Sequence, residues 1–209
     1  MEREHIVYGA YLLFFIIFMG LILATPILSF TGDTKLLYTA FSYTCHQKIS
    51  RSVCIFKDAK GYFMADCLPQ NGVFISDAND RTQIRTEING VVGYKMPVCA
   101  RDLGLYIAML AGGLTYPFVR KLNSKEVWPA IWLVVAIIPL GIDGTVQLLS
   151  ELGFLPFVYE STNLMRMLTG AIAGFVATFY AIPLLINLIT PNGPKENKKT
   201  ANTKRELKN

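Results

Sequence analysis

The chain has 209 residues, of which 52% are hydrophobic, and a formal net charge of +5 at pH 7. Apolar runs of about 20 residues recur along it, each long enough to cross a bilayer, so the composition excludes an ordinary soluble domain. The basic excess lies mainly in short loops and in the C-terminal tail, where it predicts membrane orientation, and it offers no support for nucleic-acid binding.

Four apolar runs predict an all-α membrane fold, a four-helix transmembrane bundle. The first run lies within 1–30 and is expected to be a retained helix, because its apolar core is too long for a signal peptide. The other three form a predicted three-helix transmembrane core over 101–190, in which Gly170 and Gly174 give the last helix a face suited to close packing. The runs are 6–30, 103–119, 128–150 and 164–189.

Basic residues predict the orientation of this bundle. The 120–127 loop contains three of them and the 191–209 tail contains six, whereas the 151–162 loop contains none. Because short loops decide topology, both termini are expected in the cytoplasm and the 31–100 segment outside it. The sequence therefore predicts a multi-pass plasma-membrane protein with a disordered, basic cytoplasmic tail.

Residues 31–100 are long enough to form a small extracytoplasmic cap. The first part of this segment, 36–44, is amphipathic and aromatic and is expected to lie along the membrane interface. Short β-like runs then alternate with turn signals such as Asn89-Gly90, which predicts short β-hairpins, and the polar stretch Ser76–Glu87 between them is expected to be mobile. The predicted strands are Val53–Phe56, Tyr62–Met64, Gly72–Ile75 and Val91–Tyr94.

All four cysteines lie in this predicted cap. In an oxidising compartment four cysteines allow two disulfides, and Cys54 with Cys67 is expected to close a hairpin. For Cys45 and Cys99 three alternatives stay open, because reactive residues flank both: a disulfide that ties the two ends of the cap, metal coordination, or redox-active thiols.

Metal coordination would use four neighbouring groups, Cys45, His46, Cys99 and Asp102. They offer the sulfur, nitrogen and oxygen ligands that zinc accepts, so Zn is the cofactor such a site would hold. Cys99 and Asp102 are three residues apart and lie on nearly one face of the predicted helix. Against this reading, adjacent Cys-His side chains diverge unless the backbone turns.

Asp143 is the residue that stands out most in the third apolar run. A carboxylate within the hydrocarbon costs roughly 2.5–3.5 kcal/mol on insertion scales, and such residues usually face a partner or a wet cavity. Gln147 lies one turn further along the same helix face. At about 1.5 Å per residue, Asp143 and Arg166 come to the same depth, roughly 9–11 Å below the outer surface, which predicts a buried ion pair between them.

Further polar residues map to the same outer end and suggest a binding site there. Arginine guanidinium groups bind phosphate and carboxylate in a bidentate manner. The leading hypothesis is a membrane enzyme that acts on an anionic lipid or isoprenoid headgroup, with His46 or Asp143 as the catalytic general base. The residues expected to bind the substrate are Arg51, Arg101, Gln147, Glu160, Asn163 and Arg166.

Two other functions are open. An ion- or proton-coupled small-solute transporter would use Asp143 as its relay and, with four helices and no evident repeat, would have to be a homodimer. A second intramembrane polar group near the cytoplasmic end would favour it, and the sequence indicates none. A thiol-disulfide or metal-handling membrane protein would use Cys45 and Cys99.

Four blocks of residues, taken in chain order, carry a resemblance. They are Cys45-His46-Gln47 with Arg51-Ser52, Pro97-Val98-Cys99-Ala100-Arg101 with Gly104 and Tyr106, Pro139 to Asp143-Gly144 with Gln147, and Glu160-Ser161-Thr162-Asn163 with Arg166, Gly170 and Gly174. Together they resemble a family of uncharacterised polytopic prokaryotic membrane proteins (domain of unknown function, family 2085). Family members usually have a second cysteine where this chain has Asp102, a departure that weakens a dithiol mechanism. The family has no established activity, so the resemblance implies where the site lies.

Overall fold

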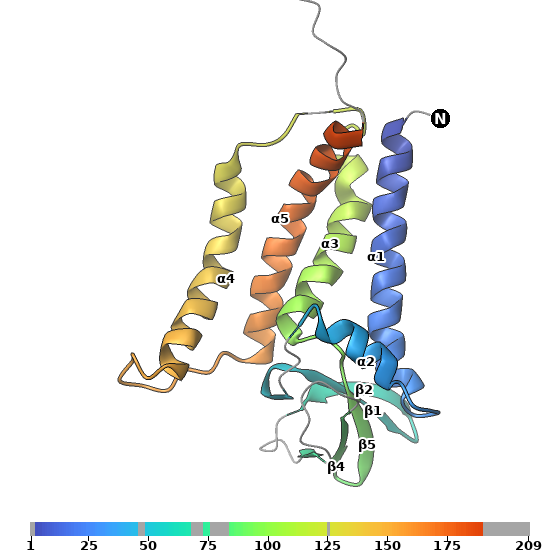
Figure 1. The fold of residues 1–209 in the computed structure, drawn as a ribbon, viewed down its shortest axis with the longest axis vertical. Helices are drawn as coiled ribbons and strands as arrows, with labels where there is room; N and C mark the ends of the chain where they lie inside the picture. The colour runs from blue at the N-terminus through green and yellow to red at the C-terminus, as the bar shows by residue number, and fades with distance from the viewer. Residues whose placement is uncertain (1–2, 46–48, 68–72, 76–83, 125, 190–209) are drawn as a thin grey trace, which may run out of the picture.

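The computed structural model describes residues 3–45, 49–67, 73–75, 84–124 and 126–189. Within this part of the chain, four helices are long and apolar enough to cross a membrane, and an antiparallel sheet lies beyond one end of them (Figure 1). The helices are α1 (Arg3–Leu28), α2 (Lys35–Ser42), α3 (Ala100–Val119), α4 (Ala130–Glu151) and α5 (Asn163–Ile189), with a short 3₁₀ helix, η1 (Ile49–Arg51). The strands are β1 (Val53–Asp58), β2 (Gly61–Asp66), β3 (Val73–Ile75), β4 (Arg85–Ile88) and β5 (Val91–Lys95).

The helices α1, α3, α4 and α5 coincide with the four predicted apolar runs, and each helix end lies within three residues of its prediction. The start of α1, the end of α5 and the loop between α3 and α4 share one end of the bundle, which we call the far end (Figure 1). The sheet, α2 and the loop between α4 and α5 lie at the opposite end, which we call the cap end (Figure 1).

Helix α3 packs closely against α5 because glycines stand at the contact. A Cβ added to Gly104, Gly170 or Gly174 would lie 2.1, 2.2 and 2.3 Å, respectively, from a backbone oxygen of the facing helix. No side chain fits such a separation, so the two backbones approach as closely as small residues allow. Close packing through Gly170 and Gly174 is therefore confirmed.

Hydroxyl groups join α1 to this pair of helices within the apolar interior. Tyr11 OH lies 3.0 Å from Thr178 Oγ1 of α5, and Tyr8 OH donates to the Gly113 carbonyl of α3 at 2.9 Å. In a bilayer the hydrophobic effect does not draw helices together, so interhelical hydrogen bonds and van der Waals packing hold α1 in place.

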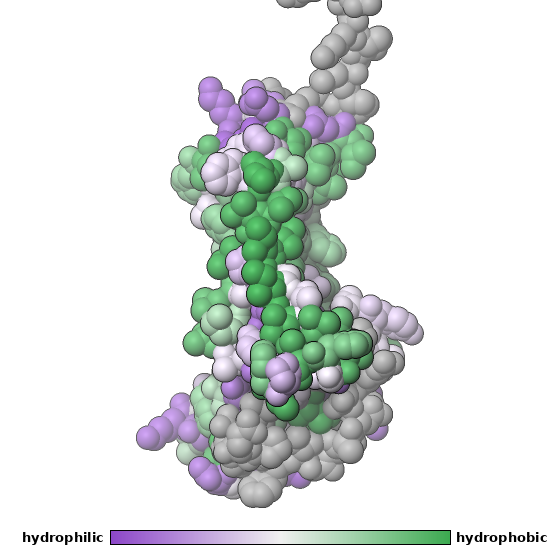
Figure 2. Space-filling view, turned by 90° about the vertical axis from the view of Figure 1, so that its left-hand side faces the viewer, coloured by the Kyte–Doolittle hydropathy of each residue, from purple (hydrophilic) through white to green (hydrophobic). Residues whose placement is uncertain are grey.

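Helix α4 contacts the rest of the bundle through few side chains. All 22 of its residues are described, and three of them are buried: Ala136, Asp143 and Gln147. In the space-filling view, the outward side chains of α4 form a hydrophobic column between the more polar ends (Figure 2). Two of the three buried residues are polar, so polar contacts at the cap end contribute much of the attachment of α4.

The cap is a five-stranded antiparallel sheet with strand order β2-β1-β5-β4-β3. Asn89 and Gly90 connect β4 to β5 with φ of 49° and 81°, the left-handed values that an Asn-Gly hairpin turn requires. The expectation that Ser76–Glu87 is mobile is wrong for Arg85–Glu87, which pairs with β5. Polarity misled the prediction, because a strand with one exposed face carries polar residues at alternate positions.

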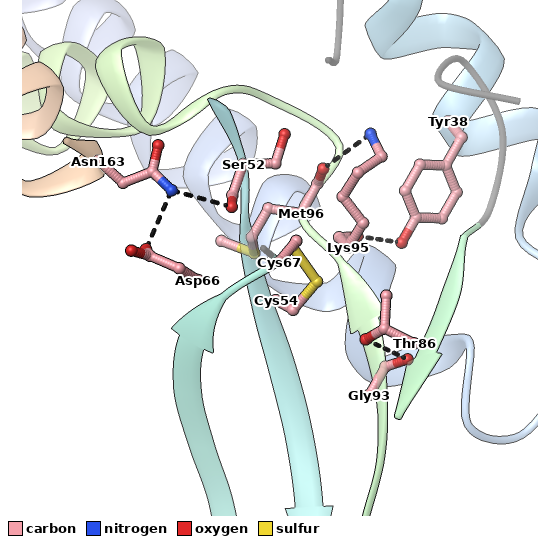
Figure 3. The surroundings of a disulfide bond; sticks show 10 residues. All are labelled: Tyr38, Ser52, Cys54, Asp66, Cys67, Thr86, Gly93, Lys95, Met96 and Asn163. Carbon is pink, nitrogen blue, oxygen red and sulfur yellow. Dashed lines mark hydrogen bonds between the residues drawn. A yellow bond between two sulfur atoms is a disulfide. The ribbon is translucent and has the colours of Figure 1, made fainter. Parts of the chain in front are cut away.

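Helix α2 lies across the cap end and packs on the sheet through Tyr38 and Phe41, both buried. Tyr38 OH donates to the Lys95 carbonyl at 2.5 Å, and the fully buried Lys95 ammonium lies 5.8 Å from the centre of the Tyr38 ring (Figure 3). This contact covers a buried cation with an aromatic face.

A disulfide joins Cys54 on β1 to Cys67, which follows β2, as the sequence predicts (Figure 3). Both cysteines are fully buried and pack with Phe56 in a small core of the cap. The bond therefore closes the hairpin at the end that faces the bundle.

Replacing both cysteines in Cys54→Ser/Cys67→Ser should lower the stability of the cap by about 3 kcal/mol, because the open chain regains loop entropy. Thermal unfolding of the purified protein in a buffer that contains a metal chelator measures this, with Cys45→Ser as the control for loss of a cysteine outside the bond. Intact-mass analysis after alkylation of the denatured, unreduced chain should show two modified cysteines. An unchanged melting temperature or four modified cysteines would contradict the assignment.

Candidate functional site

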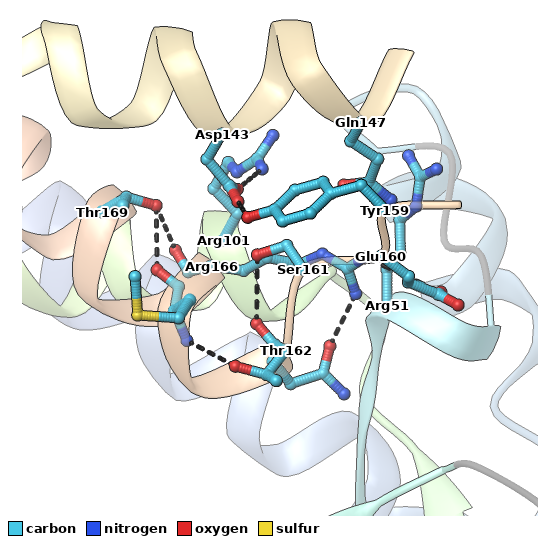
Figure 4. Close-up of polar contacts among 12 residues, drawn as sticks. Arg51, Arg101, Asp143, Gln147, Tyr159, Glu160, Ser161, Thr162, Arg166 and Thr169 are labelled. Carbon is cyan, nitrogen blue, oxygen red and sulfur yellow. Dashed lines mark hydrogen bonds and ion pairs between the residues drawn. The ribbon is translucent and has the colours of Figure 1, made fainter. Parts of the chain in front are cut away.

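The carboxylate of Asp143 is buried at the cap end, where Ser161, Tyr159 and Arg101 contact it (Figure 4). It forms an ion pair with the guanidinium of Arg101 from α3, and it accepts a hydrogen bond from Tyr159 OH at 2.9 Å. The predicted ion pair between Asp143 and Arg166 is wrong, because the partner is Arg101.

The close approach of α3 to α5 explains this partner. Gly170 leaves room for the side chain of Arg101, whose Cγ lies 3.3 Å from the position that a Cβ on Gly170 would take. Arg101 Nη1 then lies 3.4 Å from the corresponding position on Gly144 of α4. Counting residues places Asp143 and Arg166 at similar depth, but it takes no account of a side chain that reaches across from α3.

Arg166 is 2% exposed, although it is the most polar residue of α5. Its Nη1 donates to Asn163 Oδ1 at 3.0 Å and to the Ser50 carbonyl at 3.3 Å, and its Nη2 lies 3.8 Å from Glu160 Oε1. Its Nε has no hydrogen-bond partner among the residues that the structure describes. The Glu160 carboxylate is therefore only a weak counter-ion for this buried cation, because the distance is near the upper limit for an ion pair and the Glu160 side chain is half-exposed.

Gln147 brings two guanidinium groups together. With its amide oriented so that the oxygen faces the donors, that oxygen lies 2.9 Å from Arg166 Nη2, 2.9 Å from Arg51 Nη2 and 3.1 Å from Arg51 Nε. Arg51 also forms an ion pair with Glu151. Two cations from η1 and α5 thus converge on one neutral oxygen of α4.

Asn163 ties the site to the cap. Its Nδ2 donates to Asp66 Oδ1 at 3.0 Å and to the Ser52 carbonyl at 3.3 Å (Figure 3), while its oxygen accepts from Arg166. The first turn of α5 is therefore held against β1 and β2, and the position of Arg166 depends on the folded sheet.

The structure brings together most of the residues that the sequence predicts for the site. The seven residues from the predicted set that meet at the cap end are Arg51, Arg101, Asp143, Gln147, Glu160, Asn163 and Arg166. His46 lies outside the described residues, so its predicted roles as base and ligand are not placed. The sequence analysis did not predict Tyr159 or Glu151 as site residues. Tyr159 directly precedes Glu160, a predicted site residue, and Glu151 is the last residue of α4, so their positions at the helix ends were the available signal.

The hydroxyl of Tyr159 lies in the loop between α4 and α5. Its hydrogen bond to Asp143, with a smaller contribution from desolvation, raises the pKa of Tyr159 above its ordinary value. The phenol therefore remains protonated and continues to donate to Asp143 across physiological pH.

A second polar cluster lies at the N-terminus of α3. Cys45, Cys99 and Asp102 are half-buried, with potential ligand atoms all within 4.8 Å of one another. The Cys99 thiol donates to Asp102 Oδ2 at 3.2 Å, and the Cys99 backbone N–H donates to Cys45 Sγ at 3.3 Å. The Cys45 thiol, burial and the Asp102 carboxylate raise the pKa of Cys99. No disulfide joins Cys45 to Cys99, so that alternative is contradicted.

At the far end, Arg120 is a partly buried cation that the sequence treats as a loop charge. Its side chain is 8% exposed, and its guanidinium lies 5.5 Å from the centre of the Trp128 ring. Nη2 lies 3.4 Å from Ser124 Oγ. These are contacts of a helix end with its own loop.

The fold and this site define a polytopic membrane protein with a polar cluster where the sheet meets one end of the helices. The family model described as "Predicted membrane protein (DUF2085)" matches residues 89–180. The uncharacterized protein MJ1492 of Methanocaldococcus jannaschii is 31% identical over 186 residues, which cover 85% of this chain and 92% of that protein. The chain belongs to this family. No solved structure matches it.

Proposed function

We propose that this protein recognises the anionic headgroup of a membrane lipid at the cap end, in the outer leaflet. The observation that carries the proposal is the convergence of Arg51 and Arg166 on the single neutral oxygen of Gln147. Two guanidinium groups that share a neutral acceptor repel each other, and a phosphate or carboxylate oxygen at that position would relieve the repulsion.

The distribution of carboxylates supports this reading. Glu151 and Glu160, which pair with Arg51 and Arg166, are 42% and 56% exposed, so both lie at the rim of the site. Arg166 itself is buried, and its Nε has no hydrogen-bond partner in the part of the chain that the structure describes. A buried guanidinium that lacks a close counter-ion is costly, which favours an external anion as its partner.

The loop beside the site supports a lipid rather than a soluble ligand. The loop between α4 and α5 exposes Phe154, Phe157 and Val158, the last of them 96% exposed, just before Tyr159 and Glu160. Apolar and aromatic side chains at the level of the helix ends are typical of segments that lie in the membrane interface. A headgroup at that level would reach Arg51 and Arg166 without leaving the bilayer.

Asp143 takes a positioning role in this proposal. With Arg101 and Tyr159 both donating to it, its carboxylate is a poor general base, and it holds those two side chains at the edge of the site. The proposal is therefore one of headgroup recognition, and a reaction at the same site would need a base other than Asp143.

Arg51→Gln and Arg166→Lys should each weaken binding of an anionic lipid by roughly 10- to 100-fold, because each removes charge-assisted or bidentate hydrogen bonds. The protein in detergent is titrated with dihexanoyl phosphatidylglycerol and followed by native mass spectrometry. Lys60→Gln, which removes an exposed cation from a turn of the cap, should bind as the unaltered protein does. Unfolding curves without lipid establish that each variant is folded.

Two further ligands identify the source of the anion. Dihexanoyl phosphatidylcholine should bind weakly, since its headgroup has no net charge, and inorganic phosphate should bind weakly, since it lacks acyl chains. Phosphate that binds as tightly as the lipid would assign the site to a soluble anion. Equal affinity of both lipids, or variants that bind normally, would contradict the proposal.

A further inference from the structure

Three side chains that can each supply an anionic metal ligand, Cys45, Cys99 and Asp102, lie close together at the start of α3. Cys45 follows α2 at a distance of three residues, Cys99 precedes α3, and Asp102 lies in the first turn of α3. Two thiolates and a carboxylate carry three negative charges when deprotonated. A redox-active dithiol requires positively charged surroundings that stabilise a thiolate, and Asp102 supplies the opposite charge.

We propose that Cys45, Cys99 and Asp102 form a binding site for a thiophilic divalent metal ion of the zinc class. The site is separate from the headgroup site and does not depend on it. The donor set of two sulfurs and one oxygen is one that zinc accepts, and three protein ligands leave a fourth position for water or another donor.

The distances fit an ion of this size. Two sulfur ligands of a tetrahedral zinc lie roughly 3.8 Å apart, given Zn–S bonds of about 2.3 Å. The three ligand atoms now lie within 4.8 Å of one another. They can close around an ion through side-chain rotations that move each atom by about 1 Å or less.

The hydrogen bonds of the cluster already orient the ligands. The proton that the Cys99 thiol donates to Asp102 Oδ2 occupies the place between two donors that a metal ion would take. The backbone N–H of Cys99 points at Cys45 Sγ, and bonds from peptide N–H groups to sulfur are a means of fixing and stabilising a thiolate ligand. The sulfur of Cys45 is therefore held in position before any ion binds.

The Cys54–Cys67 disulfide also supports a metal ion at Cys45 and Cys99. Disulfides form and persist in oxidising compartments, where two close thiols such as Cys45 and Cys99 would also oxidise. Coordination to zinc, which has no redox chemistry, protects thiolates from that reaction. A bound ion would also join the segment after α2 to the first turn of α3.

The full-length protein in detergent is loaded with zinc, desalted and analysed for metal content. One equivalent is expected in the unaltered protein, and Cys99→Ser and Cys45→Ser should each lose affinity by roughly 100-fold or more in competition with a chelating dye. Asp102→Asn keeps the side-chain shape and should lose about 10-fold. Cys54→Ser/Cys67→Ser is the matched control, since it removes two cysteines of the same cap and should retain the metal.

Cobalt gives a second measurement that does not depend on affinity alone. Cobalt bound to the unaltered protein should show sulfur-to-metal charge-transfer absorption. This absorption should be about half as intense per bound ion in Cys99→Ser, which keeps one sulfur ligand, and should vanish in Cys45→Ser/Cys99→Ser. Lipid binding by Cys99→Ser should be normal, which separates this test from that of the headgroup site. The proposal is overturned if the protein binds no zinc, if the three variants retain it, or if non-reducing mass analysis finds Cys45 joined to Cys99.

Discussion

Gly170→Ala should prevent α3 from packing against α5 and lower stability by roughly 3 kcal/mol or more. Overpacking a filled contact usually costs about 1–3 kcal/mol, and here the Cβ would lie 2.2 Å from the backbone oxygen of Arg101, which cannot rotate away. The two helices must separate along their length. Thermal unfolding in detergent, with size-exclusion chromatography to detect misfolded protein, measures the effect.

Gly141→Ala is the matched control for this change. Gly141 lies in α4, and a Cβ there would meet no atom within 4 Å. Alanine also favours a helix over glycine by about 1 kcal/mol, so this variant should be as stable as the unaltered protein or slightly more stable. Equal destabilisation by Gly170→Ala and Gly141→Ala would show that the contact between α3 and α5 is not close.

Asp143→Leu should destabilise the protein by about 3 kcal/mol and loosen α4 at the cap end. It leaves the guanidinium of Arg101 without its counter-ion, and removal of one partner from a buried pair costs roughly 3–5 kcal/mol. The lower end of that range applies because the Arg101 side chain is 24% exposed. The measurement is thermal unfolding, together with the rate of proteolysis in the loop between α4 and α5, which lies at the cap end.

A double-mutant cycle separates the ion pair from the loss of either side chain alone. Arg101→Leu/Asp143→Leu should be more stable than the sum of the two single changes predicts, because no unpaired charge remains. Arg166→Leu/Asp143→Leu serves as the comparison, since the sequence predicts that pair and the structure does not form it. Stronger coupling of Asp143 to Arg166 than to Arg101 would refute the arrangement described above.

The sequence predicts where the polar site lies but not which groups pair within it. Depth follows from the rise per residue of a helix, and counting predicts a similar depth for Asp143 and Arg166. Pairing also depends on how far each helix is rotated and how closely it packs. Asp143 pairs with Arg101 because Gly170 leaves room for the Arg101 side chain to extend from α3 past α5 to α4.

In the cap, too, the sequence predicts the local features but not the contacts between distant residues. The Asn89-Gly90 turn and the Cys54–Cys67 bond are local features that short-range chemistry predicts. The strand Arg85–Ile88 escapes prediction because its pattern is polar and its order comes from pairing with β5. The link from Asn163 to Asp66 likewise joins residues 97 apart, and no local signal indicates it.

The hydrogen bond from Arg166 to the Ser50 carbonyl spans 116 residues of chain, and it has a consequence for biogenesis. Contacts so distant in sequence form slowly, because the intervening chain must be ordered before they can close. Arg166 lies on α5, the last of the four candidate spanning helices to be synthesised, and its partner Ser50 lies in η1, just before β1. The cluster around Gln147 therefore forms among the last contacts of the molecule, once α5 is in the membrane and η1 has reached its place beside it.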